Sequence, residues 1–405
     1  MLGSIPLLIG QARVRFQEAL NMAIMRLVLF LGNLSIGYNR DILRGIGDYA
    51  VQDRNLHIMF PTDFEPTSTN SLNQLAPSGV IAGACPQFGQ LLSRLIGSGT
   101  PAVDVSAERE TAGLPRITTD DQAMGAMAAE YFINRGFKNL VYYGMAARHW
   151  SAMRWRGFQK RGQQEDVKVR HFDRPTGTAN HQAGLFPCPV ADWIKSLHHP
   201  SAIFAGDDLL GAELLYTCQL LDIKVPEELA ILGVGNEDLY GVWRNNRLSS
   251  VVLNTAEIGR RAIETLNRLM EHRAPLSATI QIPPIRIVTR FSTDIFGVSD
   301  ELVRRALELI HKQFGSGISV KGLAYKLAVS RPTLERRFTS ALGRSPAVEI
   351  SRVQADFARR RLLDSNQCVE KVAEEAGYAC ARQLRAALDQ HFGTTPRELR
   401  KLRRT

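Results

Sequence analysis

The stretch from Ser201 to Asn236, SAIFAGDDLLGAELLYTCQLLDIKVPEELAILGVGN, holds the pattern that decides the fold of most of this chain. Two apolar runs, SAIFAGD and LAILGVG, flank a stretch of helical character at 209–221. Runs this short and this rich in branched apolar residues are typical of buried parallel strands. The stretch therefore predicts a strand, a helix and a second strand of one parallel sheet.

The same alternation continues on both sides of this stretch. Helices are expected at 40–54, 122–135 and 256–272, among further apolar runs: RLVLFLG, LHIMF, GVIAGA, PAVDVS, NLVYYGM and LSSVVLN. Alternating strands and helices predict an α/β fold of doubly wound parallel sheets with helices on both faces. With 405 residues, the chain is long enough for two or three units that each have a core.

Polar residues cluster where the predicted strands end. In such sheets ligands bind beside the carboxyl ends of the strands, so these side chains are expected to line one crevice. For each aspartate among them, capping of the following helix is an equally weighted alternative to ligand contact. The expected residues are Asn33, Tyr38, Asp120, Asp121, Asp207, Asp208 and Asn236.

The sequence lacks the motifs of common catalytic and nucleotide-binding sites. It contains no GxGxxG or GxxxxGK[ST] stretch opening a helix, no GxSxG elbow and no HExxH. The two aspartate pairs could serve acid–base chemistry on a glycoside, but carboxylates, amides and an arginine also suit the binding of sugar hydroxyls. Binding is the simpler interpretation, so we expect no catalytic residue, no metal and no cofactor.

The cysteine content and the hydropathy of the sequence indicate the cellular compartment in which the protein is expected. Five scattered cysteines without a CxxC pair indicate neither a disulfide framework nor a zinc site, which favours a reducing cytoplasm. The run MAIMRLVLFLG contains Arg26 and is shorter than the roughly 20 residues of a membrane helix, so it predicts a buried strand and no membrane partner. SIPLLIG near the start has neither a preceding basic residue nor a clear cleavage site, so no secretory signal is expected.

Four stretches resemble the LacI/GalR family of sugar-sensing regulator domains, which share the fold of periplasmic sugar-binding proteins. They are ITTDDQAMGAMAAEYFINRGFKNLVYYG, RWRGFQKR, AIFAGDDLLGAELLYTCQLLDIKVPEELAILGVGNED and LSSVVLNTAEIGRRAIETL. The resemblance implies a two-lobed sensor at 26–292 whose sugar contacts include Asp121, Arg154 and Asp207. Where that family often has an aspartate, this chain has Gly235 followed by Asn236, which removes a carboxylate acceptor and leaves the sugar open.

The net charge of +10 lies almost wholly in the last part of the chain. Residues 296–405 hold 21 Lys and Arg against 12 Asp and Glu, a net charge of +9, which leaves +1 for the first 295 residues. A basic block of this size suggests contact with a polyanion, most plausibly nucleic acid. A solvated basic surface is the alternative that composition alone leaves open.

A repeat with a spacing of 50 residues runs through this basic block. The repeated positions are Leu323 and Ala373, Leu334 and Leu384, Phe338 and Leu388, Leu342 and Phe392, Gly343 and Gly393, and Pro346 and Pro396. Each copy has a short helix, a tight turn and a second helix with apolar residues every four positions, which predicts helix-turn-helix units near 319–343 and 369–393. A connecting helix at 346–363, roughly 27 Å long, could set both units into successive major grooves.

The second helix of each unit is expected to present a polar face to the major groove of double-stranded DNA. An arginine fork can pair with guanine or bridge phosphates, and a glutamate can accept from cytosine. An amphipathic helix with a merely solvated face is the alternative. The expected DNA-binding residues are Ser330, Arg331, Pro332, Thr333, Glu335 and Arg336 in the first unit, and Arg382, Gln383 and Arg385 in the second.

Residues 296–405 resemble the DNA-binding domain of the AraC/XylS family, through ISVKGLAYKLAVSRPTLERRFTSALGRSP and VEKVAEEAGYACARQLRAALDQHFGTTPRELR. The second unit departs from that family: Leu384 and Leu388 stand where an aromatic is usual, and Arg382 stands near a usual small polar residue. This departure suggests that the second unit binds DNA less conventionally.

A LacI-type sensor followed by an AraC-type domain resembles the bacterial regulators of xylose operons. The resemblance implies a cytoplasmic, nucleoid-associated transcription factor that is a homodimer, binds a pentose such as xylose and contacts promoter DNA, with RNA polymerase as a further partner. A DNA-binding regulator with a degenerate pocket, or with a ligand other than xylose, is the alternative that Gly235 keeps open.

Overall fold

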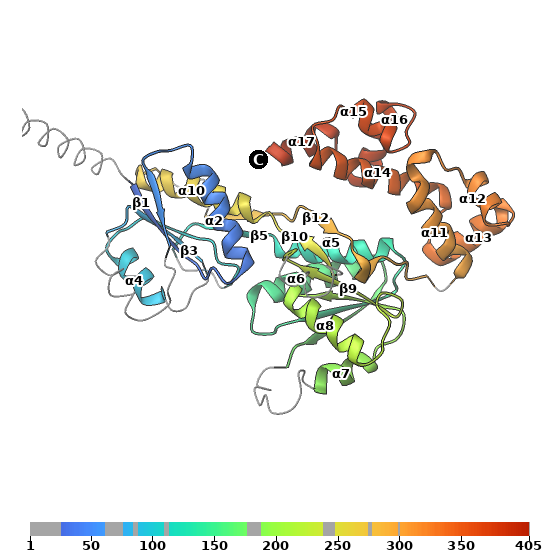
Figure 1. Cartoon of the computed structure of the whole chain (residues 1–405), viewed down its shortest axis with the longest axis horizontal. Coiled ribbons are helices and arrows are strands. Elements are labelled where there is room, and N and C mark those ends of the chain that lie inside the picture. Colours follow the sequence, from blue (N-terminus) through green and yellow to red (C-terminus); the bar gives the residue numbers. More distant parts are fainter. Residues whose placement is uncertain are drawn as a thin grey trace, which may run out of the picture.

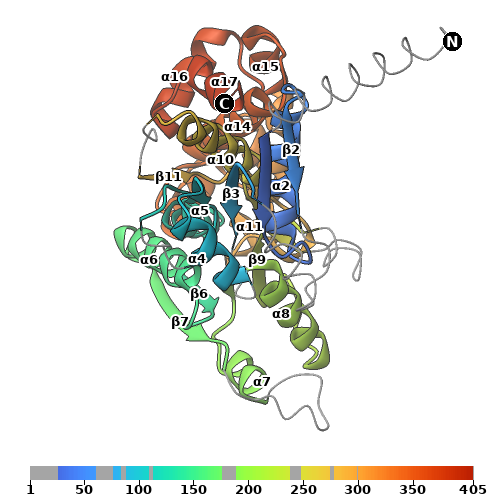
Figure 2. The same cartoon turned by 90° about the vertical axis from the view of Figure 1, so that its left-hand side faces the viewer.

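The computed structural model describes residues 26–60, 76–83, 88–108, 113–175, 188–237, 248–273, 278–298 and 300–404. These residues form two α/β lobes and a helical C-terminal domain (Figure 1). The helical domain and α7 (Cys188–Lys195) lie at opposite ends of the molecule in both views (Figure 2). The expectation about a secretory signal concerns residues outside the described ranges.

Lobe 1 is built on a six-stranded sheet in which every neighbouring pair is parallel. Helices α2 (Gly37–Ala50), α4 (Gly89–Gly97) and α10 (Thr255–Met270) belong to this lobe. In sheet order its strands are β11 (Thr279–Ile282), β5 (Arg116–Thr119), β4 (Ala102–Asp104), β3 (Gly79–Ala82), β1 (Arg26–Leu31) and β2 (Leu56–Met59).

Lobe 2 has a second six-stranded sheet, parallel except for one antiparallel edge pair between β12 and β10. Helices α5 (Asp121–Asn134), α6 (His149–Gln164), α7 and α8 (Asp208–Leu220) accompany it. In sheet order its strands are β12 (Arg286–Val288), β10 (Ser249–Val252), β9 (Leu229–Val234), β8 (Ser201–Ala205), β6 (Asn139–Gly144) and β7 (Lys168–Asp173).

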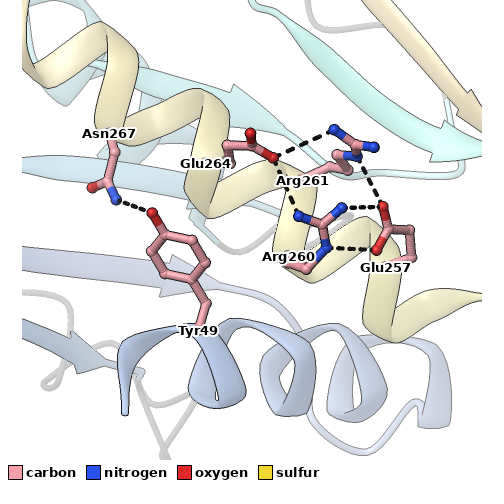
Figure 3. Close-up of polar contacts among 6 residues, drawn as sticks. All are labelled: Tyr49, Glu257, Arg260, Arg261, Glu264 and Asn267. Atoms are coloured by element: carbon pink, nitrogen blue, oxygen red, sulfur yellow. Dashed lines mark hydrogen bonds and ion pairs between the residues drawn. The ribbon is translucent and has the colours of Figure 1, made fainter. Parts of the chain in front are cut away.

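The chain crosses between the lobes three times: at Asp120, at 253–254 and at 283–285. After the second crossing, α10 packs on α2, where Asn267 Nδ2 donates to the Tyr49 hydroxyl at 3.2 Å (Figure 3). Glu257 and Glu264 pair with Arg260 and Arg261 along the same helix (Figure 3). Three crossings give the lobes a common hinge while each keeps its own core.

The helical domain contains two helix-turn-helix units joined by a long helix. The first unit packs Leu334, Phe338 and Leu342 into a core with α11, and the second packs Leu384 and Leu388 against α14 and α15. Its elements are α11 (Glu301–Gln313), η3 (Phe314–Ser316), α12 (Val320–Lys326), α13 (Arg331–Leu342), α14 (Pro346–Asp364), α15 (Val369–Glu375), α16 (Ala381–Phe392) and α17 (Pro396–Arg404).

The fold class predicted from the sequence is confirmed: two doubly wound parallel sheets are followed by an all-helical domain. Each apolar run that predicted a strand forms one. Among the described residues, no helix is both long enough and apolar enough to cross a membrane.

Candidate functional site

A buried ion pair joins α5 to α6 at the place where the sequence predicts the crevice. Arg154 Nε donates to Asp121 Oδ1 at 2.9 Å, and Arg154 Nη1 donates to the carbonyl oxygen of Gly206 at 2.5 Å. The Arg154 guanidinium also lies 4.7 Å from the ring centroid of Trp150, within cation–π range. The pair therefore joins the start of α5 to the carboxyl end of β8, where sequence reasoning expected the ligand.

The side chain of Tyr38, on α2 of lobe 1, lies near the Asp121–Arg154 pair. Its hydroxyl donates to the Val105 carbonyl at 3.1 Å. Burial raises the pKa of this phenol well above its ordinary value, and the negative charge of nearby Asp121 raises it further. Tyr38, Asp121 and Arg154 are thus brought together, with one member from lobe 1 and two from lobe 2.

Two of the expected crevice aspartates cap helices. Asp120 accepts a hydrogen bond from Ala123 N at the start of α5, and Asp207 accepts one from Leu210 N at the start of α8. Burial raises the pKa of Asp207 and that of Asp121, and the Arg154 charge opposes the rise in both. Arg154 therefore acts electrostatically on two carboxylates at the crevice.

The two expected asparagines are engaged in local structure. Asn33 Oδ1 accepts from the Ser35 amide at 2.9 Å and from its hydroxyl at 2.7 Å. Asn236 Oδ1 accepts from Arg290 Nη2 at 2.6 Å. Within the described ranges, neither asparagine side chain is hydrogen-bonded to the Asp121–Arg154 pair.

Two ion pairs between the lobes were not predicted from the sequence. Arg40 Nη2 on α2 lies 2.8 Å from Glu237 Oε1, which follows β9 in the other lobe. Glu108 Oε1, which follows β4 in lobe 1, accepts from Arg148 Nη1 at 2.8 Å and from Trp150 Nε1 at 3.2 Å. These contacts hold the two lobes together in this structure.

The position of the Asp208 carboxylate explains why residue 235 is a glycine and not an aspartate. The Asp208 carboxylate is 3% exposed and accepts from Ser250 Oγ at 2.6 Å and from Glu237 N at 2.8 Å. A Cβ on Gly235 would lie 3.5 Å from Asp208 Oδ2, and the φ of +125° at Gly235 disfavours any side chain. An aspartate at position 235 would therefore add strain and a second carboxylate next to a buried one.

The first helix-turn-helix unit presents its expected residues at the start of α13. Ser330 accepts from Thr333 N at 3.3 Å as the N-cap, and Pro332 lies in the first turn. Arg331 Nε donates to Glu335 Oε1 at 2.9 Å, while Arg336 is exposed. Arg331 and Glu335 therefore form an ion pair with each other in the first turns of α13, and Arg336 follows Glu335 as an exposed residue.

The second unit uses its expected residues differently. Gln383 Oε1 accepts from Ala379 N at 3.1 Å, so this side chain supports the turn before α16. Arg382 and Arg385 are exposed, and Arg385 Nη2 lies 4.0 Å from Glu370 Oε1 on α15. The N-cap residue of α16 is Cys380, whose side chain makes no capping hydrogen bond.

Two family models match the chain: a periplasmic binding protein-like domain at residues 129–293 and a helix-turn-helix domain at residues 323–402. Together with the two-lobed fold and the exposed arginine face of α13, they define a transcription regulator in which a ligand-sensing domain precedes a DNA-binding domain. Regulators of this class are not normally enzymes.

Over 92% of its length the chain is similar to two curated relatives. It is 27% identical to the xylose operon regulatory protein of Haemophilus influenzae and 25% identical to that of Escherichia coli K12, covering 97% and 96% of those proteins. A solved structure titled "xylose-binding transcription activator xylR" matches with a TM-score of 0.58 and 24% identity, over 93% of this chain and 98% of that one. The resemblance expected from the sequence, a LacI-type sensor with an AraC-type domain behind it, is confirmed.

Proposed function

We propose that this chain is a pentose-responsive transcription regulator that binds xylose between its lobes and thereby changes its hold on promoter DNA. The observation that carries the proposal is the buried Asp121–Arg154 pair, which faces Tyr38 across the crevice. A carboxylate accepts from sugar hydroxyls and a guanidinium donates to them, so the pair offers both halves of sugar recognition. The names of the full-length relatives support xylose as the sugar.

The proposed mechanism is a shift between open and closed lobes. A sugar that contacts both lobes favours the closed arrangement only because it gains contacts there that the open arrangement lacks. The Arg40–Glu237 and Glu108–Arg148 pairs cross the crevice and add to the closed state. Closure around three hinge segments would then change the geometry that the DNA-binding domains present.

We further propose that residues 26–292 form the sensor and residues 296–405 the DNA-binding domain, acting as a homodimer in the bacterial cytoplasm and nucleoid, with RNA polymerase as a partner. DNA contact is assigned to the outer faces of α13 and α16. Helix α14 has 19 residues and spans roughly 28 Å, which suits two helices that enter successive major grooves on one side of the duplex.

A thermal-shift panel on the full chain tests the sensor. Xylose, arabinose, ribose and glucose are compared at millimolar concentration. At 100 times its dissociation constant, a bound sugar should stabilise the chain by about 2.7 kcal/mol. We expect the shift with xylose to be lost in Arg154→Ala and kept in Arg156→Ala, which removes an exposed arginine from the same helix.

A rise in melting temperature with a different sugar would identify that sugar as the ligand, and the proposal of a sugar-responsive regulator would stand. No shift with any sugar in the wild-type chain would contradict the sensor proposal and favour a DNA-binding regulator with a degenerate pocket.

A further inference from the structure

The segment that leads from the sensor to the DNA-binding domain is bonded into lobe 2. Ser292 Oγ donates to the Ile231 carbonyl at 2.6 Å and accepts from Ser249 N at 2.8 Å. Thr293 Oγ1 donates to Ser249 Oγ at 2.6 Å and is paired with the Tyr131 hydroxyl of α5 at 2.6 Å. Both Ser292 and Thr293 are fully buried, so this segment is part of lobe 2 and not a free tether.

The C-terminal end of α5 touches the DNA-binding domain just beyond that segment. Gly297 N donates to the Arg135 carbonyl at 2.9 Å. A methyl group on Gly136 would lie 2.6 Å from Val298 Cγ2 and 2.9 Å from Leu342 Cδ2, so side chains of the first helix-turn-helix unit pack directly on this turn. The contact leaves no space for a solvent layer between the two parts.

A buried charge cluster fixes the same contact. Arg344 Nη2 donates to the Asn134 carbonyl at 2.6 Å, where a cation also meets the negative end of the α5 dipole. Arg344 Nε donates to Glu349 Oε2 at 2.6 Å, and Arg352 Nη2 donates to Glu349 Oε1 at 2.6 Å. Glu349 is fully buried, which by itself would raise the pKa of its carboxyl, but the neighbouring His311 ring and the cations Arg352 and Arg344 hold this pKa well below the ordinary range. A buried carboxylate needs such partners, so Arg344 is held in the orientation that reaches α5.

The other end of α5 carries Asp121, the partner of Arg154 in the crevice. The helix has 14 residues and is roughly 20 Å long. Figure 1 shows α5 on the side of lobe 2 that faces α11 and α14. One straight element thus begins at the proposed sugar site and ends against the DNA-binding domain.

We propose that α5 carries the ligand signal, because its C-terminal turn and the Arg344–Glu349 pair fix the first helix-turn-helix unit and the start of α14 to lobe 2 as one rigid body. Lobe closure then moves this body as a whole relative to lobe 1. The docking contact is independent of which sugar binds. Only its signalling role rests on the proposed function.

Hydrogen exchange of the full chain, followed by mass spectrometry, tests the docking contact without any sugar. Arg344→Met removes the hydrogen bond to Asn134 O. The control Arg304→Met removes the same charge from α11, where Arg304 pairs only with Glu301 and Glu308 of its own helix among the described residues. We expect peptides that cover 131–137 and 294–298 to exchange at least about tenfold faster in Arg344→Met and unchanged in Arg304→Met. Peptides from the buried core of α13 should stay protected in both variants, which shows that the domain is folded.

Operator titrations with and without xylose test the signalling role. We expect the xylose-dependent ratio of DNA dissociation constants to approach one in Arg344→Met and to keep its wild-type value in Arg304→Met, with xylose affinity unchanged in both. Equal exchange in the two variants would overturn the docking contact. Faster exchange with an unchanged ratio would overturn signalling through α5. A wild-type ratio of one would count against the proposed function, while the exchange result would still decide the contact.

Discussion

Asp208 shows how a single buried carboxylate can make stability depend on pH. Burial raises its pKa from 3.8 to about 6, and the hydrogen bonds from Ser250 and Glu237 only partly offset that rise. The folded chain therefore binds this proton more tightly than the unfolded chain does. The free energy of unfolding consequently falls as pH rises from about 4 to about 6, and this contribution is constant above that range.

Asp208→Asn should remove this part of the pH dependence. We expect the loss of stability between pH 4 and pH 6.5 to be smaller in the variant by about 2 to 3 kcal/mol, measured by urea unfolding of the full chain at several pH values. Asp121, whose pKa is also raised, contributes equally to the wild type and the variant and cancels in the difference, whereas the negative charge of Asp207 helps to raise the pKa of Asp208 and is part of the effect being measured. The control Asp48→Asn removes an exposed carboxylate from α2 and should keep the wild-type slope. Identical slopes for Asp208→Asn and the wild type would mean that Asp208 ionises normally in the folded chain.

At the residue scale, sequence reasoning reached the crevice only in part. Asp121 and Arg154 can be named because the resemblance covers the stretches that hold them, and the sequence leaves helix capping by Asp120 and Asp207 open as an alternative to ligand contact. The Arg40–Glu237 pair joins residues 197 positions apart, one in each lobe. No local pattern encodes such a contact, so it could not be predicted from one sequence.

At the scale of elements, hydropathy predicts the buried strands and the apolar edge strand β2, but it does not predict a polar edge strand such as β7. Strands β3, β8 and β9 are buried along their whole length and appear as continuous apolar runs. The edge strand β7 has the sequence KVRHFD and exposes much of its surface, so it carries no such run. An exposed edge strand is held by backbone hydrogen bonds to one neighbouring strand rather than by burial of its side chains. Such hydrogen bonds leave no hydropathy pattern in the sequence.

Helix α13 supports a prediction about DNA binding. Arg336 is exposed on the outer face, and within the described part of the chain it forms no ion pair that would compete with DNA. We expect Arg336→Ala to weaken operator binding by about 1 to 3 kcal/mol if the guanidinium reads a base, as measured by gel-shift titration at fixed salt. Arg304→Ala loses the same charge on α11 and should bind nearly as the wild type does. Equal affinities for the two variants would remove Arg336 from the base-reading face.

At the scale of the whole molecule, the net charge is distributed unequally between the sensor and the DNA-binding domain. The DNA-binding domain carries nearly all of the net positive charge, whereas the sensor is close to neutral and holds a buried ion pair where α5 and α6 meet. Attraction to DNA and recognition of a small neutral sugar are therefore separated along the chain. The two parts meet at the junction 289–298, which is bonded to lobe 2 on one side and packed on α13 on the other, and at the contact of Arg344 with the end of α5.

This arrangement predicts a reciprocal effect between sugar and DNA. If xylose changes operator affinity by some factor, operator DNA must change xylose affinity by the same factor, because both are paths around one thermodynamic cycle. A coupling of 1 to 3 kcal/mol corresponds to roughly 5- to 150-fold. Xylose affinity should be measured by calorimetry with and without saturating operator DNA, and operator affinity with and without saturating xylose. A scrambled duplex of equal length serves as the control, because it supplies the phosphate charge without the sequence. With the operator, we expect xylose and DNA to change each other's affinity by equal factors, and with the scrambled duplex we expect a factor near one. If operator DNA left xylose affinity unchanged, the closed and open lobes would present the same DNA-binding geometry.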